Sequence, residues 1–254
     1  WIRPLSDLHR GNMGTVLVCC PDTTGNVPDP INSQSVSFAV ARGDDAVEKL
    51  HGDVAGDTDP HRSVARIRRQ LPEKPVICIL GSTTFNDPKT EERVNSIASV
   101  FRERLGHRVT FVTGGMNGVQ LTFAKRFEGG DLFQILPAGK QSDFQYGTDL
   151  HAGQNHEQRQ EVFGLVGHLY LTVEGGPGVA KEAGIAVRNG ACVIPLMSSG
   201  GASGGLFDFP KECFSKPSWA PEPQWNLLEK KEATPSEVAA ALTELMEIYL
   251  DRIC

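Results

Sequence analysis

The sequence predicts an α/β fold, a doubly wound parallel sheet between helices in the Rossmann-like, three-layer αβα arrangement. The first observation is the continuous apolar segment 76–81 (VICILG), which is typical of a strand buried on both faces of a parallel sheet. The second is that such segments alternate with amphipathic helical patterns from residue 75 onward. The third is that glycines follow the apolar segments where a strand turns into a helix.

The elements can be predicted in chain order. Strands are expected at 76–81, 109–115, 132–137, 168–173 and 191–197, and helices at 86–106, 118–127, 155–166 and 178–189. A long loop is expected from Ala138 to about Gln154, and a flexible glycine-rich loop followed by proline- and aromatic-rich coil from 198 to 225. Thr234 and Glu237 form a capping box that begins the last helix, whose apolar stripe favours the core or a dimer interface.

Residues 1–74 are interpreted as an N-terminal extension, and residues 75–254 as the Rossmann-like domain. The extension has two expected strands, 13–20 and 35–41, and a basic helical segment, 61–71. The arginines of that segment favour a solvated face or a partner interface over contact with phosphate. Because the chain begins with Trp1, a processed or truncated N-terminus is expected.

Composition excludes several classes of function. A net charge of −6 and a pI near 5.7 argue against nucleic-acid binding, and no apolar segment is long enough to predict a transmembrane helix. The 6 cysteines lack the spacing of metal ligands, so neither a metal nor a cofactor is predicted. They fit a reduced compartment, either the cytoplasm or an organelle interior, and the sequence does not say which.

Three turns at the ends of expected strands are candidate ligand-binding segments. Glycines there allow a ligand to approach the backbone, and the free N–H groups of a helix N-terminus favour an anion. A nucleotide or sugar-phosphate ligand is therefore predicted. The candidate binding residues are Gly81, Ser82, Gly114, Gly115, Asn117, Gly118, Gly175, Gly176 and Gly178.

Residues 75–197 resemble the Lonely Guy (LOG, lysine-decarboxylase-like) family of the Rossmann-type superfamily of nucleotide and ligand sensors. The resemblance is carried by Gly81-Ser82-Thr83, which matches a Gly-Ser-Ser turn, and by TGGMNGVQL at 113–121, which matches Gly-Gly-Gly-x-x-Gly-Leu-Met-Gly. The segment EGGPGVAKE at 174–182 matches the hallmark Pro-Gly-Gly-x-Gly-Thr-x-x-Glu.

The resemblance implies hydrolysis of the N-glycosidic bond of a nucleoside 5′-monophosphate, with Arg159 and Glu182 as catalytic residues, in a homodimer or larger assembly. The chemistry is consistent with these residue types. A carboxylate such as Glu182 can stabilise an oxocarbenium-like transition state, and the planar fork of Arg159 can hold phosphate or polarise the leaving base. Considered singly, Glu182 also fits a first-turn helix carboxylate and Arg159 a surface ion pair.

The chain departs from the family pattern at three points. Val179 replaces the hallmark threonine, Glu174 replaces the hallmark proline, and GVQL at 118–121 replaces Gly-Leu-Met-Gly. A carboxylate at position 174 that pointed toward a bound phosphate would cost about 3 kcal/mol at a separation of ~6 Å. These departures predict weakened phosphate contacts on a retained strand framework.

Three functions remain open from the sequence. The first is a phosphoribohydrolase that uses Arg159 and Glu182. The second is a catalytically inactive relative that senses a nucleotide-like ligand. The third is an accessory subunit of a larger complex, such as one in an organelle. The N-terminal extension and Val179 favour the second and third, whereas Arg159 and Glu182 favour the first.

Overall fold

A computed structural model describes residues 59–142 and 144–254. The expected strands 13–20 and 35–41, and Asp143, lie outside the described residues. The strands form one parallel sheet of six strands in the order β4-β3-β2-β1-β5-β6. They are β1 (Val76–Gly81), β2 (Thr110–Thr113), β3 (Leu132–Leu136), β4 (Thr148–His151), β5 (Leu169–Val173) and β6 (Cys192–Leu196).

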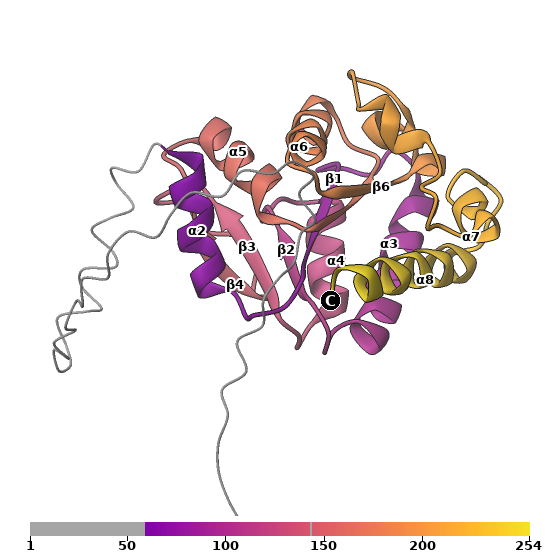
Figure 1. Cartoon of the computed structure of the whole chain (residues 1–254), viewed down its shortest axis with the longest axis horizontal. Helices are drawn as coiled ribbons and strands as arrows, with labels where there is room; N and C mark the ends of the chain where they lie inside the picture. Colours follow the sequence, from indigo (N-terminus) through magenta and orange to yellow (C-terminus); the bar gives the residue numbers. More distant parts are fainter. Residues whose placement is uncertain (1–58, 143) are drawn as a thin grey trace, which may run out of the picture. The chain divides into compact units, whose positions relative to one another are not determined.

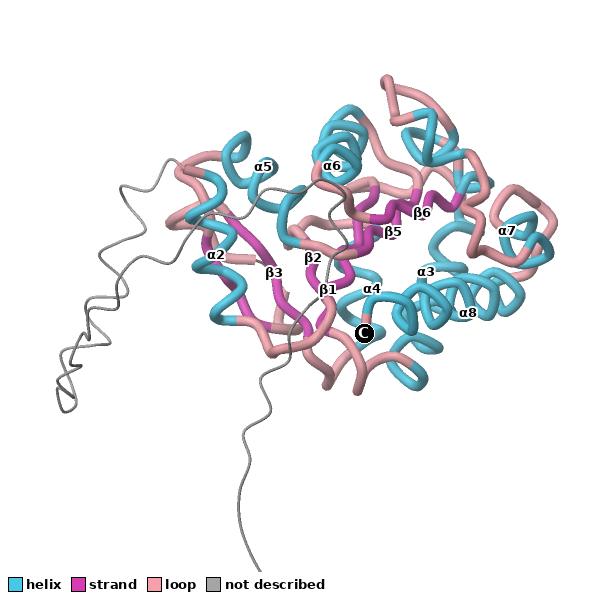
Figure 2. Tube along the Cα trace, viewed as in Figure 1, coloured by secondary structure: helices cyan, strands magenta, loops and turns pink. Residues whose placement is uncertain are grey.

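Helices cover both faces of this sheet (Figure 1, Figure 2). They are α2 (Pro60–Gln70), α3 (Pro88–Arg104), α4 (Val119–Phe127), α5 (His156–Val166), α6 (Pro177–Arg188), α7 (Glu222–Leu227) and α8 (Pro235–Ile253). Helices α3, α4 and α8 pack on one face, and α2, α5 and α6 on the other. The predicted three-layer, doubly wound α/β fold is therefore confirmed.

Two apolar clusters lie on the two faces of the sheet. The cluster under α3, α4 and α8 contains a group of stacked and edge-on rings, Phe101, Phe111, Phe123 and Phe127. The cluster under α2, α5 and α6 surrounds Tyr170, whose hydroxyl accepts from Gly167 N and donates to Phe163 O. Every residue of β1 is buried because its side chains enter both clusters.

The strand order positions the site. From β1 the chain winds outward through β2, β3 and β4, and it then returns to place β5 on the other side of β1. The connections after β1 and β5 therefore leave on opposite faces of the sheet, and a crevice opens between the carboxyl ends of these two strands. In open α/β sheets this reversal point is where ligands bind.

Two regions differ from the sequence prediction. The expected loop at 138–154 contains β4, a short edge strand with largely exposed or half-buried residues, which lacks the apolar signal of a buried strand. The coil expected after residue 198 contains three 3₁₀ helices, η2 (Met197–Ser199), η3 (Gly201–Gly204) and η4 (Lys211–Phe214), as well as α7.

Helices near both ends of the described chain pack on the sheet layers. Helix α2, in the segment interpreted as an extension, buries Ile67, and the Arg68 guanidinium donates to Val166 O at the end of α5. Helix α8 has the predicted capping box of Thr234 and Glu237, and its apolar stripe packs in the core. Within the described residues, no helix is both long and apolar enough to cross a membrane.

Candidate functional site

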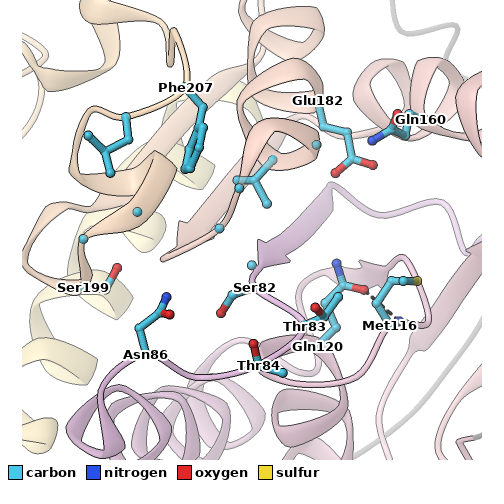
Figure 3. A pocket seen from close by; sticks show the side chains of 18 of the residues that line it. Ser82, Thr83, Thr84, Asn86, Met116, Gln120, Gln160, Glu182, Ser199 and Phe207 are labelled. Carbon is cyan, nitrogen blue, oxygen red and sulfur yellow. Dashed lines mark hydrogen bonds between the residues drawn. The ribbon is translucent and has the colours of Figure 1, made fainter.

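A cavity of about 730 Å³ opens at the carboxyl ends of β1 and β5, and side chains from several elements surround it (Figure 3). We call each segment that leads from a strand to the start of the next helix a mouth. The first mouth is 81–87, the second is 113–118, and the third, which includes the first residues of α6, is 174–179. Each contributes residues to the cavity lining, for example Ser82, Met116 and Gly176. The volume lies in the range of small-molecule sites.

The first mouth is occupied by a carboxylate of the protein itself. Glu174 is fully buried, and its Oε2 accepts from Ser82 Oγ at 2.7 Å and from Asn86 Nδ2 at 3.1 Å. Its carboxylate also accepts from the backbone N–H groups of Asn86 and Asp87, just before α3 begins. These donors form the kind of anion site that a helix N-terminus offers, and Glu174 already fills it.

Glu174 also joins the loops around the cavity through its backbone. It has a positive φ of 53°, a conformation that is uncommon for a non-glycine residue. Its N–H donates to Ser199 Oγ, and its carbonyl accepts from Ser203 N and Ser203 Oγ. The Glu174 carboxylate points to the first mouth and does not line the cavity. It is therefore not in the inward-pointing position from which it would repel a bound phosphate.

The second mouth is occupied by an amide oxygen. Gln120 Oε1 accepts from Gly114 N and Met116 N, both at 3.0 Å (Figure 3 marks one of these bonds). The N–H of Gly115 donates to Thr113 Oγ1. The N–H groups of Gly114, Gly115 and Met116, which the glycine spacing suggested for a phosphate, are therefore already bound within the protein.

The third mouth is open. Gly176 caps α6 without a side-chain hydrogen bond, and Pro177 follows at the first helical position. Among the described residues, no acceptor bonds the N–H groups of Gly176, Gly178 and Val179. A Cβ added to Gly176 would meet nothing within 4 Å, so the space beside these donors is free. The positive end of the α6 dipole adds to their attraction for an anion.

A buried ion pair lies beside the third mouth. Arg159 Nη1 donates to Glu182 Oε1 at 2.6 Å, and the two side chains are 3% and 5% exposed. The pair forms because α5 and α6 approach closely at Gly164, where a Cβ would lie 2.7 Å from Ile185 Cβ. Arg159 Nε donates to Ile135 O, and the guanidinium lies over the ring of Phe163 at 4.7 Å. Both ionic side chains line the cavity.

Each member of the pair keeps unused hydrogen-bonding capacity. Arg159 Nη2 is buried and has no partner among the described residues, and it lies beside Gly114, where a Cβ would be 1.5 Å away. Among the described residues, the Glu182 carboxylate accepts a hydrogen bond at Oε1 only. Figure 3 shows the Glu182 carboxylate pointing from α6 toward the strand ends.

Burial sets the electrostatics of the cavity. Desolvation raises the pKa of Glu182 from 4.5 to about 7, although Arg159 opposes this shift. Desolvation, together with the charges of Arg159 and Lys181, lowers the pKa of His156, so the neutral imidazole is favoured at neutral pH. Arg159 is thus the cationic side chain of the cavity lining at neutral pH, and it is paired with Glu182. Binding of an anion would depend on the α6 N–H groups and on Arg159.

The apolar rim of the cavity was missed by sequence reasoning. Met116, Leu206 and Phe207 line the cavity and are 37%, 58% and 49% exposed. The sequence offered one signal, an apolar pair directly after a run of glycines at 200–205, but this segment was interpreted as a flexible loop. In the structure it is held by Ala202 and Ser203, which are both fully buried.

The structure brings most predicted site residues together. Those that line the cavity are Gly81, Ser82, Arg159, Gly175, Gly176, Gly178 and Glu182. Those that do not are Gly114, Gly115, Asn117 and Gly118. Gly118 packs against the carbonyl of Ser82, and Gly115 against the side chain of Leu136, so their glycine character is explained by close packing.

Two other polar side chains near the strand ends have structural partners. His168 Nδ1 accepts from Val76 N. Asp149 accepts from the N–H and hydroxyl of Ser142. Within the described residues, no three His, Cys, Asp or Glu side chains form a group that could hold a metal ion.

No protein-family model and no curated protein matches the chain, but solved structures do. TM1055, a structural genomics target, is 21% identical, with 51% of this chain and 78% of that chain covered and a TM-score of 0.44. The molybdenum cofactor binding protein of Rippkaea orientalis is 19% identical, with 69% and 99% covered and a TM-score of 0.45. The Moco carrier protein of Chlamydomonas reinhardtii is 18% identical, with 69% and 99% covered and a TM-score of 0.44.

At these identities and scores the comparisons assign no ligand and no reaction to this chain. The fold class rests on the six parallel strands and their order, which make it a Rossmann-like three-layer α/β protein. Membership of the Lonely Guy family stays a prediction from the sequence motifs.

Proposed function

We propose that the cavity binds a phosphorylated small molecule of the nucleoside 5′-monophosphate class, with its phosphate at the first turn of α6. The observation that carries this proposal is the unpaired set of N–H groups at Gly176, Gly178 and Val179, beside an open cavity of about 730 Å³. At the other two mouths, Glu174 accepts from the N–H groups of Asn86 and Asp87, and Gln120 accepts from those of Gly114 and Met116. The first turn of α6 therefore offers the donors of a helix N-terminus without an internal acceptor in their place.

The Arg159–Glu182 pair lies beside this site and would face the sugar of such a ligand. A polar ligand atom that reached Arg159 Nη2 would satisfy a buried donor that now lacks a partner. The contact of Arg159 with Glu182 and Ile135 O makes it a residue that positions the carboxylate rather than the main phosphate ligand.

Two matched substitutions at Gly176 test the phosphate site. In Gly176→Asp the new carboxylate can accept from the N–H groups of Gly178 and Val179, since Asp is a preferred N-cap residue and the space is free. It would hold the helix while repelling phosphate, and we expect affinity for AMP to fall about a hundredfold. Gly176→Ala adds neither acceptor nor charge and should retain most of the affinity.

Binding is measured by titration calorimetry with AMP, ribose 5-phosphate and adenosine. The panel also includes molybdenum cofactor, the ligand for which two of the similar structures are named. Tighter binding of AMP than of adenosine, lost in Gly176→Asp but not in Gly176→Ala, would support the proposal. Equal affinity of the two variants for AMP would contradict it.

Hydrolysis of the N-glycosidic bond is the second candidate function, and the pKa of Glu182 favours it. A carboxyl group with a pKa of about 7 has both forms available at neutral pH, so it can stabilise a cationic sugar or protonate a leaving base. Release of free adenine from AMP, lost in Glu182→Gln, would establish the reaction. AMP binding without release of base would leave a ligand-binding protein that does not cleave its ligand.

A further inference from the structure

Exposed large apolar side chains concentrate at the cavity. Among the described residues, the large apolar side chains that are more than a third exposed are Met116, Leu206, Phe207 and Ile253. The first three line the cavity, and Ile253 lies near the end of α8. Scattered exposed hydrophobic residues need no explanation, but a group around one opening is typical of a binding surface.

The segment that carries Leu206 and Phe207 is held on both sides. Before it, Ser203 Oγ donates to Glu174 O and accepts from the Thr172 hydroxyl, and Leu206 N donates to Gly201 O. After it, Phe209 is buried and packs against the ring of Phe214 at 5.4 Å between centroids. Leu206 and Phe207 are therefore exposed on a turn that contacts on both sides hold in place.

The backbone at this turn is strained. Phe207 and Asp208 have φ values of 59° and 56°, which glycine adopts freely and a phenylalanine rarely does. Such conformations persist when the surrounding contacts enforce them, and they concentrate at ligand-binding sites. Figure 3 shows the consequence, since the Phe207 ring projects from its loop toward the cavity.

The chemistry of this rim complements that of the third mouth. Phe207 offers a flat aromatic face without hydrogen-bonding groups, whereas the first turn of α6 offers N–H donors without an apolar surface. A ligand that used both would be an anion at one end and a planar, weakly hydrated ring at the other. Purine and pyrimidine rings stack on aromatic side chains because every base has a π face.

We propose that Phe207, supported by Leu206, is a stacking platform for the heterocyclic base of the ligand. The proposal rests on the phosphate site proposed above, and it assigns the other end of the same ligand. Stacking discriminates weakly between bases, so the platform predicts similar affinity for several nucleoside monophosphates and lower affinity for a phosphate without a base.

The test compares Phe207→Ala, Phe207→Tyr and Ile253→Ala in the full chain, with AMP, adenosine and ribose 5-phosphate as ligands. Loss of a stacked aromatic side chain should raise the Kd for AMP and adenosine about tenfold and leave that for ribose 5-phosphate unchanged. Phe207→Tyr keeps the ring and should retain wild-type affinity. Ile253→Ala, which truncates an exposed apolar residue away from the cavity, should change none of the three.

The ligand arms separate this proposal from the phosphate site. Adenosine binding that depends on Phe207, with no gain from phosphate, would support the platform and overturn the phosphate site. Unchanged AMP affinity in Phe207→Ala, with ribose 5-phosphate still bound, would overturn the platform alone. Sedimentation of Phe207→Ala measures whether the residue instead holds a dimer together. A lower molecular mass than that of the wild type, with unchanged ligand affinity, would overturn the platform in favour of a dimer contact. Absence of binding of all three ligands by the wild-type chain would overturn both.

Discussion

The first and third mouths both contain glycine at the end of a strand, but the N–H groups of the first are bound within the protein where those of the third are not. Both follow a buried parallel strand and both lead into a helix. At the first mouth, Glu174 accepts hydrogen bonds from the backbone of Asn86 and Asp87, whereas at the third mouth the N–H groups of Gly178 and Val179 have no acceptor among the described residues. A helix N-terminus is an anion site only when the protein has not already supplied the anion.

The comparison also explains how the two mouths depend on each other. Glu174 belongs to the third mouth by sequence, yet its carboxylate serves the first, and its backbone binds Ser199 and Ser203. The residue that departs from the family pattern thus ties the cavity walls together. We expect substitutions at the occupied mouths to lower stability and substitutions at the open mouth to lower ligand affinity.

Glu174→Ala is expected to have the largest effect on stability. It removes the acceptor of the charge-assisted hydrogen bonds from Ser82, Asn86 and Asp87 and leaves a gap where the buried Glu174 side chain lay, which should lower the free energy of unfolding by about 4 kcal/mol. Urea unfolding measures the change, and Glu174→Gln, which keeps one oxygen acceptor, should lose less. Added phosphate or sulfate should stabilise the Ala variant more than the wild type, because an emptied anion site can bind it. Equal stabilisation of both would contradict the assignment of the first mouth as an occupied anion site.

The pH dependence of stability should follow Glu182. Because its pKa is raised from 4.5 to about 7 in the folded chain, the folded state binds the proton more tightly than the unfolded state does. This contribution to stability is present in full below pH 4.5 and is lost as the pH rises to about 7, a change of at most ~3 kcal/mol. Urea unfolding at several pH values should show this slope, and Glu182→Gln should flatten it. An unchanged slope in that variant would assign the effect to other groups.

Gln120→Met tests whether the second mouth resembles the first. The substitution keeps the side-chain volume but removes the acceptor of the N–H groups of Gly114 and Met116, so we expect a loss of about 2 kcal/mol in unfolding free energy. Leu121→Met serves as a control on the same helix, since it leaves these hydrogen bonds in place. A Gln120 variant as stable as the wild type would show that these amides need no internal partner.

Gly176→Ala should have the smallest effect. The added methyl group meets no atom within 4 Å and the residue has a φ of −114°, so the loss in unfolding free energy, measured by thermal unfolding, should not exceed about 1 kcal/mol, the cost of alanine at an N-cap position. Gly178→Ala provides a comparison two residues later, where the new Cβ would lie 3.0 Å from Gln160 Nε2. A large loss of stability in Gly176→Ala would mean that the open mouth is not free space.

The fold could be predicted largely from the sequence because its signals are local. The apolar segment 76–81 is buried along its whole length, and the capping box of Thr234 and Glu237 begins α8 as expected. The short strand β4 was missed, because four residues at a sheet edge need little apolar character. The glycine-rich segment at 198–205 was interpreted as flexible, because the burial of Ala202 and Ser203 depends on contacts with a strand far away in the chain.

The sequence by itself determined the parallel α/β framework and the glycine turns at its strand ends. It also placed Arg159 and Glu182 at the spacing that the Lonely Guy family pattern has. Only the tertiary structure decided which turn remains open, because a backbone N–H group is satisfied by whichever acceptor reaches it in space. Glu174 reaches Asn86 across two neighbouring strands, and no local pattern encodes that distance. The same reason applies to the turn at Leu206 and Phe207, whose exposure beside the cavity follows from how β5, β6 and η3 pack together.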